Sequence, residues 1–172
     1  MPPLSLLPTN HSTPLQLPVH VAYIQPMIAA TRSDSNFKKI RDDFSLLEDW
    51  EDRYRYLIDL GGELEPLPDM ERNDRNKVRG CASQVWLWTQ HRDDDSLHFV
   101  GDSDAHIVRG LVAVVIALFS DLSPEEIQDI DTDGKLAELD ISEHLSAQRS
   151  NGLRSMIKRI KAEARASLTE AD

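Results

Sequence analysis

The side chain with the most distinct chemistry in this 172-residue chain is its single cysteine, Cys81. Gly80 stands directly before it, and an apolar and aromatic run, residues 85–88, begins four positions after it. Glycine adopts the backbone angles of a tight turn, and β-branched and aromatic side chains favour a strand. The pattern predicts a thiol in a loop that leads into a buried strand. A loop thiol is a candidate nucleophile, whereas a buried cysteine acts as a small hydrophobe, so both interpretations stay open on spacing alone.

The composition excludes several other classes of function. One cysteine forms neither an internal disulfide nor a zinc or redox site built from a cysteine pair. A net charge of −11 argues against binding to nucleic acid and to an anionic membrane surface, because both need a basic patch. The longest apolar run, residues 111–119, is shorter than the roughly 20 residues that cross a bilayer. A lone thiol fits a reducing compartment, so we expect a cytoplasmic protein.

Two acidic clusters are candidate metal sites. Residues 129–140 carry aspartates at positions 1, 3 and 5 and glycine at position 6, as a calcium-binding EF-hand loop does. Position 12 is Asp140, however, where a longer glutamate normally reaches the ion, and an acidic turn between helices explains the same residues. Asp102, Asp104 and His106 would make a carboxylate–imidazole cluster, but capping of the next helix accounts for the aspartates. We therefore predict no metal site.

The N-terminal segment, residues 1–33, differs in composition from the rest of the chain. It holds six of the nine prolines, no aspartate or glutamate, and one basic residue, Arg32. Because proline blocks helix interiors and central strands, we expect a disordered tail followed by one domain over residues 34–172. The hydroxyl-rich, acid-free composition leaves a plastid transit peptide, and hence a plastid location, as the alternative.

The domain begins with a helical pattern and continues with a hairpin. Apolar residues recur at spacings of three and four over residues 37–58, which predicts an amphipathic helix that Gly61 and Gly62 end. After the cysteine, residues 85–91 and 97–100 read as two strands around a polar turn. The short segment before Gly80 would add a third strand.

Helices fill the remainder of the chain. They are expected at residues 105–120, where the helix is apolar nearly all round, from Ser123 onward, at 135–139 and at 150–166. Strands and helices are segregated in the sequence instead of alternating. The expected fold is therefore α+β, with a small antiparallel sheet of about three strands packed against several helices.

Four sequence blocks in a fixed order carry a resemblance to a known family. They are YLIDLG at residues 56–61, VRGCASQVW at 78–86, GDSDAHIVRGL at 101–111, and HLS followed by RSNGL within 144–153. With these blocks the chain resembles the SufE family of sulfur-acceptor proteins over about residues 37–165. One departure is Ala147-Gln148, where the family usually has proline and a hydroxyl residue.

The resemblance implies a fold, a function and partners. The fold is the small sheet packed against helices that SufE proteins share with iron–sulfur scaffold proteins of the IscU type. The implied function is to take sulfur from a PLP-dependent cysteine desulfurase of the SufS type, which it stimulates, and to carry the sulfur to a downstream iron–sulfur scaffold. The chain itself would need no cofactor, because PLP belongs to the partner desulfurase.

The resemblance also implies the site residues. Cys81 would accept the terminal sulfur of the partner's persulfide as a thiolate, which Lys77 and Arg79 would favour and desolvation by the following apolar run would oppose. Without its partner, the loop would fold the thiol back against apolar neighbours. The residues proposed to bind the partner are Lys77, Arg79, Gly80, Ser83, Gln84, Asp104 and Arg149.

Two competing functions remain. The first is an assembly scaffold that holds an iron–sulfur cluster, which the single cysteine disfavours because clusters generally take several thiolates. The second is an interaction module in which Cys81 is only a buried structural residue. The turnover of a desulfurase measured with wild type and with a Cys81→Ser variant distinguishes the sulfur acceptor from both.

Overall fold

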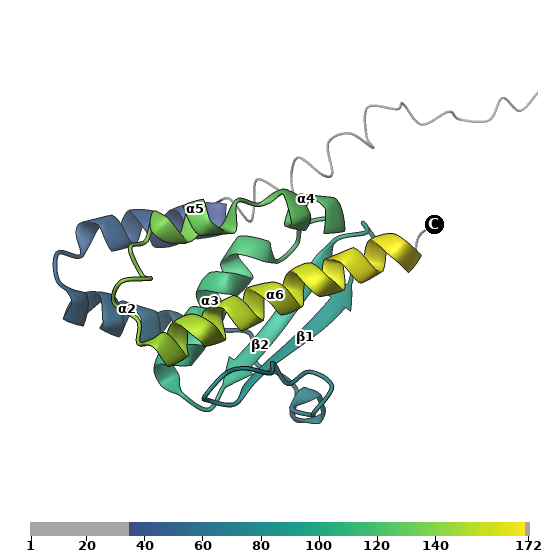
Figure 1. The fold of residues 1–172 in the computed structure, drawn as a ribbon, viewed down its shortest axis with the longest axis horizontal. Helices are drawn as coiled ribbons and strands as arrows, with labels where there is room; N and C mark the ends of the chain where they lie inside the picture. The colour runs from purple at the N-terminus through teal and green to yellow at the C-terminus, as the bar shows by residue number, and fades with distance from the viewer. Residues whose placement is uncertain (1–34, 171–172) are drawn as a thin grey trace, which may run out of the picture.

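The computed structural model describes residues 35–170, shown in Figure 1. The tail expected over residues 1–33 lies outside the described residues. No helix between residues 35 and 170 is both long and apolar enough to cross a membrane. The elements are a helix over residues 35–46, α2 (Trp50–Gly62), a 3₁₀ turn (Asp69–Glu71), β1 (Val85–His91), β2 (Leu97–Ser103), α3 (His106–Phe119), α4 (Pro124–Asp129), α5 (Thr132–Ala137) and α6 (Ala147–Glu170).

The apolar pattern over residues 37–58 forms two helices, not the one that the sequence predicts. The first ends at residue 46, and Asp49 begins the second, because its side chain accepts a hydrogen bond from the Asp52 amide at 2.9 Å. An aspartate in this capping position satisfies a backbone donor that a helix start leaves free. Phe37 and Phe44 on the first helix and Leu57 on α2 are buried in the same core.

The sheet has two strands, joined antiparallel with Val85 opposite Ser103 and His91 opposite Leu97. β1 has the predicted bounds, and β2 continues three residues beyond the predicted end at Val100. Gly101 allows this continuation because a Cβ atom there would lie 2.8 Å from a methyl group of Val112 on α3. A glycine in a strand often marks such a close approach of a neighbouring element.

The third strand expected before Gly80 is only an isolated bridge between Lys77 and Trp86. The Val78 amide donates to the Val85 carbonyl and the Leu87 amide to the Asn76 carbonyl, both at 2.8 Å. The segment that leads into the cysteine loop is thus attached to β1 along its length.

Helix α3 is the centre of the core. Most of its residues are buried, and it packs against α2, β2 and α6. Figure 1 shows α6, in yellow, running beside the hairpin, with α2 and the helix over residues 35–46 toward the other side of the molecule. The order of helices and hairpin confirms the predicted α+β class. The resulting position of α6 brings the C-terminal helix next to the loop that follows Gly80.

The acidic segment 129–140 is mostly helical. The Asp131 side chain accepts a hydrogen bond from the Gly134 amide at 3.1 Å and caps α5, which begins at Thr132. Asp131 therefore serves the turn between α4 and α5, as the alternative to a calcium loop supposed.

The contact between α2 and α3 depends on glycine at their crossing. A Cβ atom on Gly110 would overlap the Leu57 carbonyl, and one on Gly61 would lie 2.7 Å from the Gly110 amide nitrogen. Both atoms belong to backbone, which cannot move aside as the end of a flexible side chain can.

We expect Gly110→Ala to lower the free energy of unfolding by about 3 kcal/mol, since overpacking a core against backbone forces the two helices apart. Gly62→Ala is the matched control, because a Cβ atom there has no neighbour within 4 Å. The control should leave stability unchanged or raise it by up to about 1 kcal/mol, given the better helix propensity of alanine. Urea unfolding of both variants measures this, and equal effects would contradict the close packing.

Candidate functional site

The loop that carries Cys81 is held at both of its ends. On the entering side, the Val78 amide bonds to Val85 on β1. On the leaving side, Gln84 is bound through both backbone groups: its amide donates to Asp104 Oδ1 at 3.0 Å and its carbonyl accepts from Ser103 Oγ at 2.7 Å. The Lys77 ammonium joins the two sides by donating to the Gln84 side chain at 3.2 Å. Residues 79–83 are left as a short loop on a fixed base.

Asp104 therefore does not cap α3, contrary to the expectation from the sequence, and Ser103 Oγ accepts from the Ala105 amide at 3.3 Å, just before the helix. The residue that precedes α3 is Ala105, and it makes no side-chain capping bond. Both side chains bind Gln84 at the end of the cysteine loop. The Asp104 carboxylate accepts from the Gln84 amide, and the Ser103 hydroxyl donates to the Gln84 carbonyl. The contact joins residues 20 positions apart in sequence, so local pattern could not reveal it.

Gly80 forms the turn before the cysteine. Its φ angle is +94°, a backbone conformation that side chains other than glycine rarely adopt. A Cβ atom there would also lie 2.7 Å from the Ser155 hydroxyl oxygen of α6. Gly80 thus has the turn role that the sequence predicts, and a second role in letting the loop pack against α6.

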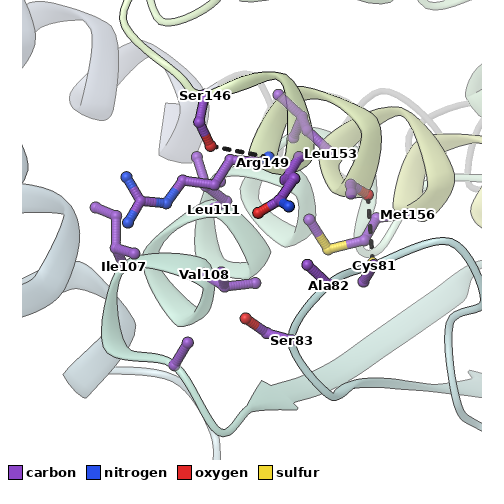
Figure 2. Close-up of a pocket in the computed structure, with 13 residues that line it drawn as sticks. Cys81, Ala82, Ser83, Ile107, Val108, Leu111, Ser146, Arg149, Leu153 and Met156 are labelled. Atoms are coloured by element: carbon purple, nitrogen blue, oxygen red, sulfur yellow. Dashed lines mark hydrogen bonds between the residues drawn. The ribbon is translucent and has the colours of Figure 1, made fainter.

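The Cys81 thiol points to α6 and lies at a cavity. Sγ is half-buried and 3.7 Å from the Gly152 carbonyl oxygen, to which the thiol donates (Figure 2). A Cβ atom on Gly152 would stand 3.4 Å from Sγ, so a small residue lets the thiol lie against the helix. The cavity measures about 280 Å³. Three segments line it: the cysteine loop (Cys81, Ala82, Ser83), α3 with the residue before it (Ala105, Ile107, Val108, Leu111), and α6 with the residue before it (Ser146, Gln148, Arg149, Gly152, Leu153, Met156).

The surroundings of Cys81 favour the neutral thiol. Burial raises the pKa of the Cys81 thiol above its ordinary value. The expectation that Lys77 and Arg79 favour the thiolate is not met at this position: burial is the cause of the raised pKa, the Lys77 ammonium is bound to Gln84 and Arg79 is exposed. A carbonyl acceptor at Gly152 also binds the protonated form. The resting thiol is therefore a protected and weakly nucleophilic group.

Arg149 lies at the other side of the cavity from Cys81. Figure 2 shows its guanidinium directed away from the thiol, near Ile107. Its Nη1 donates to the Tyr54 hydroxyl of α2 at 3.1 Å. The helix that contains Arg149 begins at Ala147, three residues before the predicted start, so Arg149 lies in its first turn.

The predicted site residues thus fall into three groups. Cys81, Ser83 and Arg149 line one cavity. Lys77, Gln84 and Asp104 lie at the base of the loop, and Gly80 forms its turn. Arg79 is exposed and is not among the residues that line the cavity.

Sequence reasoning missed most of the cavity wall. The apolar spacing of the two helices is typical of core residues, and Val108, Leu111, Leu153 and Met156 do pack in the core. Their second role as cavity wall depends on how α3 and α6 meet over the loop. No signal in the local sequence could have shown it.

Asp102 is buried beside the site without being part of it. Its carboxylate is paired with Arg72 and with Arg109, whose Nε lies 2.7 Å from Asp102 Oδ1 without a well-aligned hydrogen bond. Arg72 belongs to the connector that precedes the cysteine loop, so this ion-pair network attaches the connector to β2 and α3. Among the described residues, no three histidine, cysteine, aspartate or glutamate side chains gather as a metal site.

We expect Cys81 to react with iodoacetamide at higher pH in the folded protein than in the unfolded one. The thiolate is the reactive form, and burial raises the pKa of the folded thiol, so the pH of half-maximal rate should be higher for the folded chain. The same protein in urea is the control for the intrinsic reactivity of this cysteine. A folded-state midpoint at or below that of the unfolded chain would contradict the buried resting position.

Comparison with known proteins places the chain among relatives. Residues 38–164 match the family model SufE, described as an Fe–S metabolism associated domain. An uncharacterised SufE-like protein of Rhizobium meliloti (strain 1021) is 53% identical over 133 residues, which is 76% of this chain and 95% of that protein. A second uncharacterised SufE-like protein, from Rhizobium etli, is 52% identical over 134 residues, 76% of this chain and 90% of that protein.

A solved structure supports the fold. The solution structure of a hypothetical protein from Thermus thermophilus aligns with a TM-score of 0.63 at 18% identity, covering 78% of this chain and 96% of that chain. At this identity the likeness concerns the fold alone. The family match, in contrast, spans the hairpin, the cysteine loop and every helix from α2 to most of α6. The chain belongs to the SufE family.

Proposed function

We propose that this protein accepts sulfur on Cys81 from a PLP-dependent cysteine desulfurase of the SufS type and delivers it to a scaffold for iron–sulfur cluster assembly. The observation that carries the proposal is the placement of the only cysteine in the chain: it stands on a short loop with a fixed base, and its thiol rests in a largely apolar cavity. The association of the family with Fe–S metabolism agrees with it. The reducing cytoplasm is the proposed compartment.

The transfer needs a thiolate, and the loop provides a way to make one. In the cavity, burial and the Gly152 carbonyl both favour the neutral thiol. When the tip of the loop leaves the cavity, both effects end and the pKa of Cys81 falls toward its ordinary value. Nucleophilicity is thus linked to the position of the loop, and a partner that draws the loop out also activates the thiol.

The sulfur-transfer step balances without an added oxidant or reductant. The Cys81 thiolate attacks the outer sulfur of the persulfide on the desulfurase, a new S–S bond forms, and the S–S bond of the partner's persulfide breaks. The partner's cysteine leaves as a thiolate and takes the proton that Cys81 has released to solvent. Cys81 then carries the outer sulfur as its own persulfide.

The cavity suits the product as well as the resting thiol. Its 280 Å³ offer room beyond the thiol, and Leu111, Leu153 and Met156 supply apolar wall. A persulfide that returned with the loop would be separated from solvent by these side chains. Because the described chain offers no second thiol, the persulfide cannot discharge into an internal disulfide.

A cluster-holding scaffold is the competing function, and the cysteine count argues against it. Clusters are generally held by several thiolates, whereas one subunit supplies one. A structural Cys81 is the other competitor, and the cavity beside the thiol argues against it, because core cysteines are normally enclosed by close-packed side chains.

We expect Cys81→Ser to abolish stimulation of a SufS-type desulfurase while leaving the fold intact. Serine is nearly isosteric but cannot carry a persulfide, so turnover of the desulfurase with cysteine should fall to its rate without acceptor. Ser167→Ala, which removes one hydroxyl from α6 outside the cavity and leaves the thiol, serves as the control and should retain the stimulation. Equal stimulation by wild type and Cys81→Ser would refute the sulfur-acceptor function.

A further inference from the structure

Arg149 is the one charged residue among those that line the Cys81 cavity, and it has no carboxylate partner in the described part of the chain. Three other arginines do have one: Arg72 and Arg109 pair with Asp102, and Arg159 pairs with Glu163. The Arg149 guanidinium instead donates one hydrogen bond, to a neutral hydroxyl. A guanidinium offers five N–H donors in a planar fork that matches a carboxylate, so most of this capacity is unused.

Tyr54 fixes the position of this guanidinium. Its hydroxyl accepts from Arg149 Nη1 at 3.1 Å and donates to the His144 carbonyl at 3.2 Å, so both roles of the hydroxyl are taken. The Arg149 guanidinium also lies 5.8 Å from the centre of the Tyr54 ring, within the range of a cation–π contact. Arginine loses much rotamer freedom when it binds, and holding it beforehand reduces that cost.

Two further aromatic rings continue this surface, Trp50 at the start of α2 and His144 in the segment before α6. The His144 ring stacks on Trp50, with 3.7 Å between ring centroids and 23° between the planes. Trp50 in turn meets Tyr54 edge to face at 6.2 Å. His144 is exposed, and Trp50 and Tyr54 are half-buried. Tryptophan, tyrosine and arginine are the side chains that most often dominate binding energy at protein interfaces.

We propose that Tyr54 is a positioning residue that holds Arg149 at the edge of the Cys81 cavity to receive a carboxylate of the desulfurase, and that Trp50 and His144 extend this docking surface. The inference rests on the proposed function and goes beyond it by assigning a partner-binding surface to α2, outside the cysteine loop and α6. The chemistry of the occupant follows from the unpaired cation: an acidic side chain beside an apolar or aromatic patch on the partner.

The ordinary alternative is that the Tyr54–Arg149 bond only fastens α2 to α6. The two roles differ in what they predict for binding. A fastening bond changes the free energy of unfolding and leaves the concentration of acceptor needed for half-maximal stimulation unchanged. A positioning bond raises that concentration and leaves maximal stimulation near its wild-type value, because Cys81 is untouched.

A double-mutant cycle in the desulfurase assay tests the proposal, with a SufS-type desulfurase and cysteine as the probe. We expect Tyr54→Phe to raise the half-saturating acceptor concentration about fivefold, Arg149→Ala about tenfold, and the double variant no more than Arg149→Ala alone, since neighbouring residues that act as a unit are not additive. Effects of the two single changes that multiply in the double variant would overturn the positioning role. So would a Tyr54→Phe variant that loses stability without any change in half-saturation.

Tyr56→Phe is the matched control. It removes a hydroxyl from the same helix, but this hydroxyl donates to Asp43 at 2.7 Å, on the helix over residues 35–46. Its half-saturating concentration should equal that of wild type, and an increase as large as that of Tyr54→Phe would overturn the assignment. Cys81→Ser in the same assay distinguishes a failure of the docking surface from a failure of the proposed function. If Cys81→Ser abolishes stimulation while Tyr54→Phe has no effect, only this further inference fails.

Discussion

The Cys81 thiol rests against the Gly152 carbonyl of α6, and the elements around it hold it in that position. Burial gives the thiol a raised pKa, which protects it and also makes it a poor nucleophile. A permanently buried cysteine would be useless as a sulfur acceptor, and a permanently exposed one would be open to oxidation. In the proposed function the short loop resolves this conflict, because its tip leaves the cavity while the hydrogen bonds at its base hold.

The fixed base has a clear physical origin. Hydrogen bonds to Val85 on one side and to Asp104 on the other attach the loop to the hairpin, whose inward side chains belong to the core. The ion pairs of Asp102 attach the preceding connector to the same hairpin and to α3. Movement of residues 79–83 therefore need not disturb the core, and only a few residues have to be ordered again when the loop returns. Gly80, at a φ angle of +94°, allows the tight turn within this short span.

The sequence predicts those parts of the structure that depend on neighbouring residues. The β-branched and aromatic run of β1, the apolar character of α3, the capping serine before α4 and the glycine turn before Cys81 all follow from local rules. Contacts between distant segments were beyond such rules. The packing of Gly101 against α3, which lets β2 continue, is one such contact. The cap at Asp49 that divides one predicted helix into two is local, but the continuous apolar pattern over residues 37–58 hides it.

The residues of the site also divide into those that the sequence indicates and those that only contacts between distant segments reveal. Cys81 and its turn stand out in the sequence, and Arg149 and Asp104 came from the resemblance to a family. Neither the sequence pattern nor the resemblance indicated a role for Tyr54, because it is one of several residues in the apolar stripe of a helix. Its hydroxyl reaches Arg149 only because α2 and α6, which are 95 positions apart at this contact, meet beside the cavity.

The central claim, that Cys81 itself receives the sulfur, is tested most directly by mass spectrometry of the protein after incubation with a SufS-type desulfurase and cysteine. The account predicts that wild type gains the mass of one sulfur atom, that a reductant removes it, and that it maps to the peptide containing Cys81. An unmodified Cys81 in a sample whose desulfurase turnover is nevertheless stimulated would contradict it.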